Sequence, residues 1–182
     1  MTTPGSARPR LAGTLATVRP GRPEDVAALC AILAEPSVTR WWGEPDPVDV
    51  VAGDLLGDTG TVLLVIEVGG AVAGGVQYHE ETDPMYRHAG IDVYLGGRYQ
   101  GRGVGTEAVA LVARFLVEEL GHHRLTIDPA VDNVPAIRCY EKVGFRRVGV
   151  MRRYERGLDG TFHDGLLMDL LAEELASSAG TR

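Results

Sequence analysis

The sequence is poor in the residues on which several common kinds of site depend. Only two cysteines occur among the 182 residues, Cys30 and Cys139, and each lies in a segment of helical pattern with no partner motif. Neither a disulfide framework nor a metal-binding knuckle is therefore indicated. Lysine occurs once, as Lys142, in neither a P-loop nor a Schiff-base context, so we set both of those chemistries aside.

Long hydrophobic runs and histidine motifs are also missing. The run TVLLVIEV at residues 61–68 is too short to span a bilayer, and the start MTTPGSARPR has no apolar signal-peptide core. We therefore expect no membrane partner and a cytoplasmic location. The histidines lack the H-x-x-x-H spacing of a metal site, so no metal is expected. The net charge of -7 argues against nucleic acid as a partner and favours a cationic one.

The composition suits a single domain. Hydrophobic residues make up 45% of the chain, which is enough for one core and scarcely enough for two. We expect a flexible tail over residues 1–14, one domain over residues 15–176 and a short tail over residues 177–182.

Hydrophobic periodicity predicts alternating strands and helices, which places the fold in the α/β class. The predicted strands cover residues 14–20, 61–68, 71–80, 90–97, 123–130, 146–156 and 163–175. Gly69 and Gly70 predict a hairpin turn between the second and third of them. The predicted helices cover residues 22–35, 48–57, 104–121 and 133–144. Residues 37–47, with adjacent tryptophans, are predicted to form a loop.

The stretch RYQGRGVGTEAVALVARF, residues 98–115, places three glycines at alternate positions just before a helical pattern. A strand, a glycine-rich loop and a helix N-terminus together form an anion site, because first-turn N–H groups and the helix dipole point into the loop. A dinucleotide fold is disfavoured, because Thr106 stands where its fingerprint needs a glycine and the neighbouring strands come in hairpins.

The same stretch contains the pattern Gln100-x-x-Gly103-x-Gly105, which resembles the pyrophosphate-binding motif (Q/R)-x-x-G-x-(G/A) of the GNAT superfamily of acyl-CoA-dependent N-acetyltransferases. The later segment DPAVDNVPAIRCYEKVGF resembles the second GNAT signature, in which an Asn and a Tyr flank the thioester and the pantetheine arm. The resemblance implies a mixed, mostly antiparallel central sheet flanked by helices, with splayed strands that form the acyl-CoA site, and acetyl-CoA as co-substrate. The residues that it implies for the acetyl-CoA site are Val93, Leu95, Gln100, Gly101, Arg102, Gly103, Val104, Gly105, Thr106, Asn133 and Tyr140.

Three stretches, SVTRWWGEP, EETDPMYRHAGIDVYL and TIDPAVDNVPAIRCYEKVGF, resemble the aminoglycoside 6'-N-acetyltransferases within this superfamily. In that family the tryptophan loop lines the aminoglycoside cleft, the Asp of GID is the proposed base and the Asp of DP holds ammonium groups. The acceptor-binding residues expected here are Trp41, Trp42, Tyr78, Glu81, Asp83, Asp92 and Asp128. Either tryptophan could be the one that meets the ligand.

The end of the chain departs from this pattern. The stretch MRRYERGLDGTFHDGLLMDLL looks more like ribosomal-protein or general small-amine GNAT enzymes. The alternatives to an aminoglycoside are therefore a protein N-terminus, a siderophore or another small amine. A further alternative is a non-catalytic acyl-CoA sensor, and the protein could be a monomer or a homodimer.

Asp92 interrupts an otherwise apolar strand in which Ile91, Val93 and Leu95 face one way. A carboxylate there is costly unless it is solvated, paired or catalytic, and its alternative role is an ion pair with Arg87 or Arg124.

The resemblance implies direct acetyl transfer. Asp92 would take the amine proton, the N–H groups of Val93 and Leu95 would polarise the thioester, and Tyr140 would protonate the leaving thiolate. The alternative role of Tyr140 is to pack its ring beneath the helix. We expect the acidic side chains in the loops to be solvated. If the fold brings several of them together, they would bind a polyamine.

Overall fold

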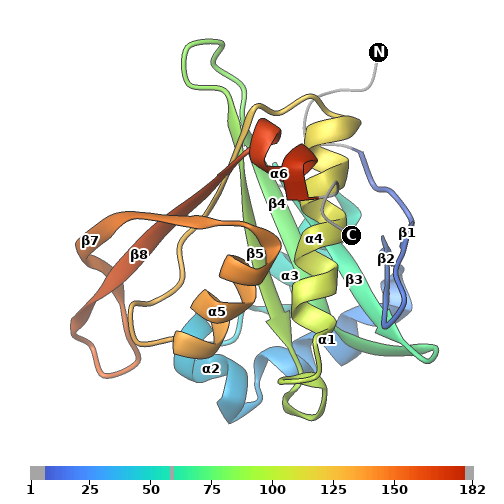
Figure 1. Ribbon diagram of the computed structural model, residues 1–182. Helices are drawn as coiled ribbons and strands as arrows, with labels where there is room; N and C mark the ends of the chain where they lie inside the picture. The colour runs from blue at the N-terminus through green and yellow to red at the C-terminus, as the bar shows by residue number, and fades with distance from the viewer. Residues whose placement is uncertain (1–6, 58–59, 179–182) are drawn as a thin grey trace.

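The computed structural model describes residues 7–57 and 60–178 of the chain (Figure 1). Within these residues, eight strands form one sheet in the order β1-β2-β3-β4-β5-β6-β8-β7. The strands are β1 (Leu11–Ala12), β2 (Thr17–Pro20), β3 (Thr61–Val68), β4 (Ala71–Glu81), β5 (His88–Leu95), β6 (Arg124–Ile127), β7 (Arg146–Arg156) and β8 (Phe162–Leu171). The helices are α1 (Val26–Leu33), α2 (Pro36–Trp42), α3 (Val48–Leu56), α4 (Val104–Glu118), α5 (Val134–Val143) and α6 (Ala172–Ser178).

The centre of the sheet is the antiparallel unit of β3, β4 and β5. Gly69 and Gly70 form the turn between β3 and β4 with φ angles of 58° and 81°, in the left-handed region that glycine enters without strain. The predicted hairpin is therefore confirmed. β5 then returns along β4 without a register shift, which aligns Gln77 with Asp92.

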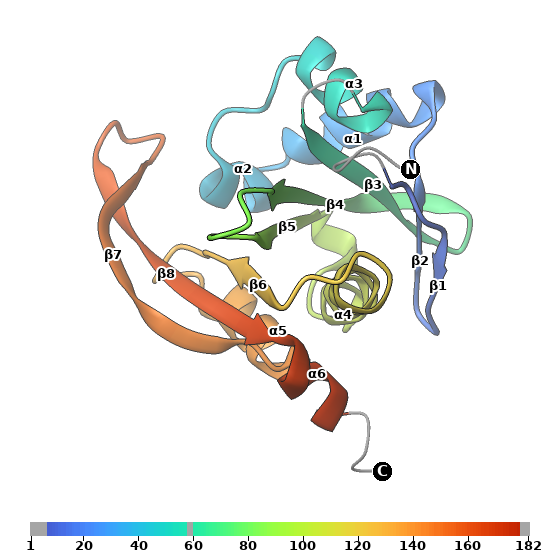
Figure 2. The same ribbon diagram turned by 90° about the horizontal axis from the view of Figure 1, so that it is seen from above.

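The sheet opens between β5 and β6. These two strands run parallel, and their pairing is confined to Ala89 with Leu125 and Gly90 with Thr126. Beyond Gly90, β5 continues to Leu95, while β6, β8 and β7 fan away from it (Figure 2). The predicted splayed strands are present, and they leave one edge of β5 without a strand partner among the described residues.

Two hydrophobic clusters hold helices on opposite faces of the sheet. α4 and α5 contribute to the cluster that includes Ile91, with Val93 and Leu95 packed against it. α1, α2 and α3 contribute to the cluster on the other face, which includes Tyr94. The predicted alternation along this strand is confirmed. None of the described helices is long and apolar enough to cross a membrane.

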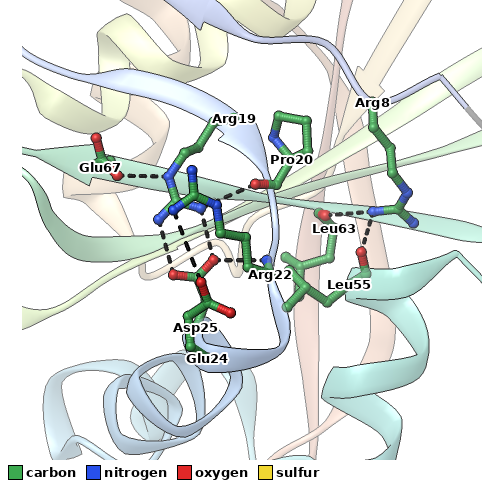
Figure 3. Close-up of polar contacts among 9 residues, drawn as sticks. All are labelled: Arg8, Arg19, Pro20, Arg22, Glu24, Asp25, Leu55, Leu63 and Glu67. Atoms are coloured by element: carbon green, nitrogen blue, oxygen red, sulfur yellow. Dashed lines mark hydrogen bonds and ion pairs between the residues drawn. The ribbon is translucent and has the colours of Figure 1, made fainter.

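The segment before residue 15 is tied to the domain, so the predicted flexible tail is wrong for its described part. The guanidinium of Arg8 donates hydrogen bonds to the carbonyl groups of Leu55 and Leu63 (Figure 3). β1 adds a short strand to the sheet edge by pairing with β2. One arginine thus satisfies carbonyl groups at the end of α3 and in β3, which composition alone does not reveal. Residues 1–6 lie outside the described part of the chain.

A buried ion-pair group fixes the start of α1 on the sheet (Figure 3). The guanidinium of Arg19 donates to both carboxylate oxygens of Asp25, at 2.7 and 2.9 Å, and to Glu67 at 2.6 Å. These hydrogen bonds from Arg19 hold the pKa of Asp25 below its usual range. Because the charges are paired in a bidentate geometry, their burial is compensated.

The predicted loop over residues 37–47 is wrong in its first half, where α2 forms. Pro36 occupies the first helical position, where its fixed φ suits a helix and its missing N–H costs nothing. Gly43, with a φ of 80°, ends the helix directly after the tryptophans. Both tryptophans are therefore held on a helix, which fixes their directions more firmly than a loop would.

The last strand also ends earlier than predicted, and α6 follows it. The carboxylate of Glu174 accepts a hydrogen bond from the N–H of Leu171 at 3.1 Å, which caps the start of this helix. Leu175 then turns into the hydrophobic cluster beneath α4. The predicted C-terminal tail is wrong at residues 177 and 178, which lie in α6, and residues 179–182 lie outside the described part of the chain.

Candidate active site

A cavity of about 790 Å³ occupies the opening between β5 and β6. Its wall is built from α2, the end of β5, the glycine loop, the segment after β6, α5 and β7. Thirteen predicted site residues line it: Trp41, Trp42, Asp92, Val93, Leu95, Gln100, Gly101, Gly103, Gly105, Thr106, Asp128, Asn133 and Tyr140. The structure therefore brings together, in one place, residues that span about a hundred positions of the chain.

The glycine loop at one end of this cavity needs glycine for backbone reasons. Gly101 and Gly103 have φ angles of 71° and 83°, which any side chain would strain. Gly103 is also the N-cap of α4 and provides no side-chain cap. The first-turn N–H groups of α4 have no partners within the helix, so this end of the cavity presents hydrogen-bond donors and the positive end of the helix dipole.

Two further contacts fix this loop against its neighbours. The side chain of Gln100 donates to the carbonyl of Leu95 at 2.8 Å, which ties the loop to the end of β5. A Cβ atom on Gly105 would lie 3.3 Å from Leu95, so this glycine allows α4 to approach β5 closely. The hydroxyl of Thr106 lies 3.2 Å from the sulfur of Cys139, which joins α4 to α5.

The exposed edge of β5 also presents backbone donors to the cavity. Gly96 donates its N–H to the carbonyl of Ala73, on the β4 side. Because successive peptide groups of a strand point to opposite edges, the N–H groups of Val93 and Leu95 point away from β4 and toward the opening. Their direction suits the predicted contact with a thioester oxygen.

Asp92 lies in the cavity wall and has no arginine partner among the described residues. The carboxamide of Gln77 donates to it at a long 3.4 Å. Arg87 instead donates to two carbonyl groups at the end of α4, and Arg124 pairs with Asp169 at 3.0 Å. The predicted alternative of an ion pair with either arginine is therefore wrong.

Burial is the main cause that raises the pKa of Asp92 above its ordinary value, and the nearby Asp128 carboxylate raises it further. A carboxylate that holds a proton more strongly than usual is a better acceptor for the proton of an ammonium group. Buried carboxylates with raised pKa values and no structural partner are typical of functional sites.

Asp128 and Glu155 are two more acidic residues that line the same cavity. Tyr154 of β7 hydrogen-bonds to Asp128, which raises the pKa of the tyrosine to about 12. Burial and the charge of Asp128 also raise the pKa of Glu155. Asp92, Asp128 and Glu155 thus form a carboxylate group in one wall of the cavity. No set of three or more potential ligand side chains among the described residues is arranged to hold a metal ion.

Tyr140 packs in the hydrophobic core and also lines the cavity, so its packing role is observed and its role as a proton donor stays a prediction. Its ring packs edge-on against Phe145, with 6.4 Å between centroids, and it belongs to the cluster beneath α5. The same residue lines the cavity, and its burial raises the pKa of the hydroxyl above its ordinary value. A tyrosine in this state keeps its proton until a strong base develops beside it. Asn133 caps α5 by accepting a hydrogen bond from Ala136 at 3.3 Å.

The two tryptophans differ in how they are held. Trp42 meets the ring of Tyr94 edge-on at a centroid distance of 4.9 Å and packs against the cluster beneath α1 and α3. Trp41 instead lies under the guanidinium of Arg40, at 4.5 Å. Both rings line the cavity, but Trp42 has the larger structural role.

Five predicted site residues do not line the cavity. Tyr78 lies opposite Ile91 in the register and is buried on the α4 face, where its hydroxyl donates to the carbonyl of Ala7. Its predicted acceptor role is wrong because a shift of one residue along a strand reverses the face, and Gln77 occupies the cavity side.

The other four lie beside or beyond the cavity. Glu81 ends β4 and Asp83 follows it, several residues past the position opposite Asp92, and both are exposed there. They therefore lie outside the cavity wall, and their contact with an acceptor stays a prediction. Arg102 is exposed in the glycine loop, and Val104 is buried beneath it, so neither side chain forms the wall. The backbone of Arg102 still belongs to the loop, and that of Val104 begins α4.

The cavity residues that were not predicted include three with polar side chains near Asp92 and Asp128, namely Gln77, Tyr154 and Glu155. Gln77 could have been found from strand alternation, because it pairs with Asp92 across an antiparallel hairpin. Tyr154 and Glu155 have no such signal. They reach the cavity where the register of β7 shifts between Met151 and Glu155, and a sequence does not reveal an irregularity of that kind.

Comparison with known proteins agrees with this geometry. The sequence profile of the acetyltransferase (GNAT) domain matches residues 16–146. The chain belongs to the GNAT acetyltransferase family. The predicted GNAT fold is thereby confirmed, and the GNAT chain is an acyltransferase, so the alternative of a non-catalytic sensor is set aside.

Among similar proteins, the aminoglycoside N(6')-acetyltransferase type 1 of Klebsiella pneumoniae is 29% identical over 154 residues, which cover 74% of this chain and 76% of that protein. The spermidine N(1)-acetyltransferase of Escherichia coli K12 is 28% identical over 156 residues and 83% of each chain. The structure of Mycobacterium smegmatis RimJ in complex with CoA-disulfide is 25% identical, covers 98% of each chain and superposes with a TM-score of 0.82.

Proposed function

We propose that this GNAT enzyme transfers the acetyl group of acetyl-CoA to a primary amine of a polycationic acceptor, the 6'-amine of an aminoglycoside. The observation that carries the proposal is the carboxylate group of Asp92, Asp128 and Glu155 beside the open edge of β5. Carboxylates with no arginine partner in the described part of the chain attract a ligand with several ammonium groups. The similarity to an aminoglycoside N(6')-acetyltransferase supports this choice.

The polarity of the cavity supports a position for the donor at the glycine loop. Backbone N–H groups gather at the glycine loop, where they suit the pyrophosphate of acetyl-CoA. Arg138 and Lys142 line the wall from α5, the helix that meets α4 through Cys139 and Thr106. Cations therefore lie near the donor phosphates, and the carboxylates lie toward the acceptor. The CoA-disulfide bound by the similar RimJ protein supports a CoA-type donor.

The chain supplies three chemical functions for direct transfer. Asp92, directly or through one water, takes a proton from the ammonium group, so that the amine nitrogen can attack the thioester carbon. The N–H groups of Val93 and Leu95 stabilise the negative charge that develops on the carbonyl oxygen. As the carbon–sulfur bond breaks, the Tyr140 hydroxyl donates its proton to the thiolate. Both substrates must be bound together, so most of the rate comes from their alignment.

A thiol-release assay with three acceptors tests this proposal. Kanamycin, spermidine and a short peptide with a free N-terminus are compared at equal concentration with acetyl-CoA. We expect kanamycin to raise CoA release above the acceptor-free rate, with a kcat/KM that falls as salt screens the carboxylates. Turnover with spermidine alone would replace the aminoglycoside by a linear polyamine, in keeping with the second relative. Turnover with the peptide alone would refute a polycationic acceptor.

A further inference from the structure

We propose that Glu107 is a positioning residue for the donor: its carboxylate holds residues 14–16 against the first turn of α4 and so fixes the glycine loop. The proposal rests on the proposed function, because it takes this loop as the site of the acetyl-CoA phosphates. It assigns a role to a segment that the sequence predicts as a tail or a strand start. It also explains why an acidic side chain stands so close to a site for anions.

The carboxylate of Glu107 accepts three backbone hydrogen bonds from one short segment. Thr14 donates its N–H to one oxygen at 2.7 Å, and Leu15 and Ala16 donate theirs to the other oxygen, both at 2.8 Å. A hydrogen bond of 2.8 Å from Gly13 to the carbonyl of Ala16 closes the turn around them. A carboxylate with three short N–H donors is strongly and specifically held.

The same turn touches the glycine loop directly. A Cβ atom on Gly103 would lie 3.2 Å from Leu15, so the leucine side chain lies against this glycine. The turn is itself anchored, because β1 precedes it, β2 follows it, and these strands pair with each other at the sheet edge. The sheet edge, Glu107 and Leu15 thus form one continuous support behind the N-terminus of α4.

The negative charge of Glu107 also affects phosphate binding at the N-terminus of α4. Glu107 is one helical turn from Gly103 and donates its own N–H to the Gly103 carbonyl at 3.0 Å. A free carboxylate in a first helical turn would compete with phosphate for the unpaired N–H groups. Here the backbone N–H groups of residues 14–16 hydrogen-bond to the Glu107 carboxylate, so it does not compete with phosphate for the N–H groups of the helix. A simple charge effect and a positioning effect therefore predict opposite results: removal of the charge alone would tighten phosphate binding, whereas loss of the support would weaken it.

The test compares CoA affinity by calorimetry in the full-length wild type, Glu107→Ala, Glu107→Gln and a matched control, Glu118→Gln. Glu118 lies on the same helix with an exposed side chain, paired with Arg114 at 4.0 Å, so the control removes the same charge far from the loop. We expect the Kd for CoA to rise about tenfold in Glu107→Ala, a change of about 1.4 kcal/mol. The rise should be smaller in Glu107→Gln, whose carbonyl still accepts, and absent in the control.

A second readout separates positioning from general damage. Acetyl-pantetheine carries the thioester without the phosphates of CoA, so its kcat/KM should remain within about twofold in both Glu107 variants. An unchanged or lower Kd for CoA, or an equal loss with both donors, would overturn the proposal. If Glu107→Ala does not fold, Glu107→Gln decides by the same criteria. Failure of the wild type to bind CoA would instead refute the proposed donor site.

Discussion

Asp92→Asn separates the chemistry of the site from its stability. The substitution keeps the shape of the side chain and can keep the long contact with Gln77, at 3.4 Å in the wild type, but it removes the proton acceptor. We expect kcat to fall by about 10²- to 10⁴-fold, the range for a missing general base. That loss corresponds to about 3–5 kcal/mol of activation free energy. CoA affinity should not change, because the phosphate site lies at the glycine loop.

The stability of this variant should move in the opposite direction. The folded state raises the pKa of Asp92 above its ordinary value of 3.8, so between the two values the unfolded chain binds fewer protons than the folded one. The free energy of unfolding therefore decreases as pH rises through that window, and at neutral pH the ionised carboxylate destabilises the fold. Asp92→Asn removes this penalty, and we expect its Tm at pH 7 to equal or exceed that of the wild type.

The assay measures kcat and KM for the amine across pH, together with thermal unfolding. The acidic limb of the wild-type profile should lie above pH 3.8, because the base must lose its proton before it can act. A variant with nearly intact kcat, a raised KM and an unchanged acidic limb would show that Asp92 binds the acceptor and is not the base. A large loss of Tm would show that its role is structural.

Three further predictions follow from the cavity wall. Asp128→Asn removes the like charge beside Asp92. The acidic limb of the pH profile of kcat should therefore shift to lower pH, and KM for the polycationic acceptor should rise. An acidic limb at the wild-type pH would contradict the electrostatic coupling between the two carboxylates. Gly101→Ala and Gly121→Ala strain φ angles of 71° and 70° at opposite ends of α4, so each should lower the free energy of unfolding by about 1–2 kcal/mol. Only Gly101→Ala should weaken CoA binding by calorimetry; equal affinities would contradict the donor site. Trp42→Ala should lower the free energy of unfolding by at least about 1 kcal/mol, because it removes the ring contact with Tyr94. Trp41→Ala should chiefly raise KM for the amine. A loss of stability in Trp41→Ala and a raised KM in Trp42→Ala would show that the two residues have the opposite roles.

The sequence predicted most of the elements and the centre of the site because those features rest on local rules. Strand alternation places the side chains of Asp92 and Ile91 on opposite faces of the sheet. Glycine spacing before a helical pattern marks the loop at Gly101 and Gly103. The resemblance to GNAT enzymes then gave the splayed sheet, which periodicity alone does not reveal. Each of these features depends on short stretches of neighbouring residues.

The errors concern contacts between distant parts of the chain. Arg8 and Glu107 bind backbone groups many residues away, and neither contact has a local signature that would distinguish an anchored segment from a tail. Tyr78 was expected at the acceptor site although it pairs with Ile91 and not with Asp92, an error that the register of the hairpin between β4 and β5 corrects. Tyr154 depends on a register shift in β7, and α2 on a proline that begins a helix.

The identity of the acetylated product tests the central claim most directly. Wild-type enzyme is incubated with acetyl-CoA and kanamycin, and the product is analysed by mass spectrometry and by NMR. The proposed function predicts one acetyl group on the 6'-amine of kanamycin for each CoA released, and loss of this product in Asp92→Asn. Release of CoA without acetylated kanamycin, or acetylation only at another amine, would contradict it.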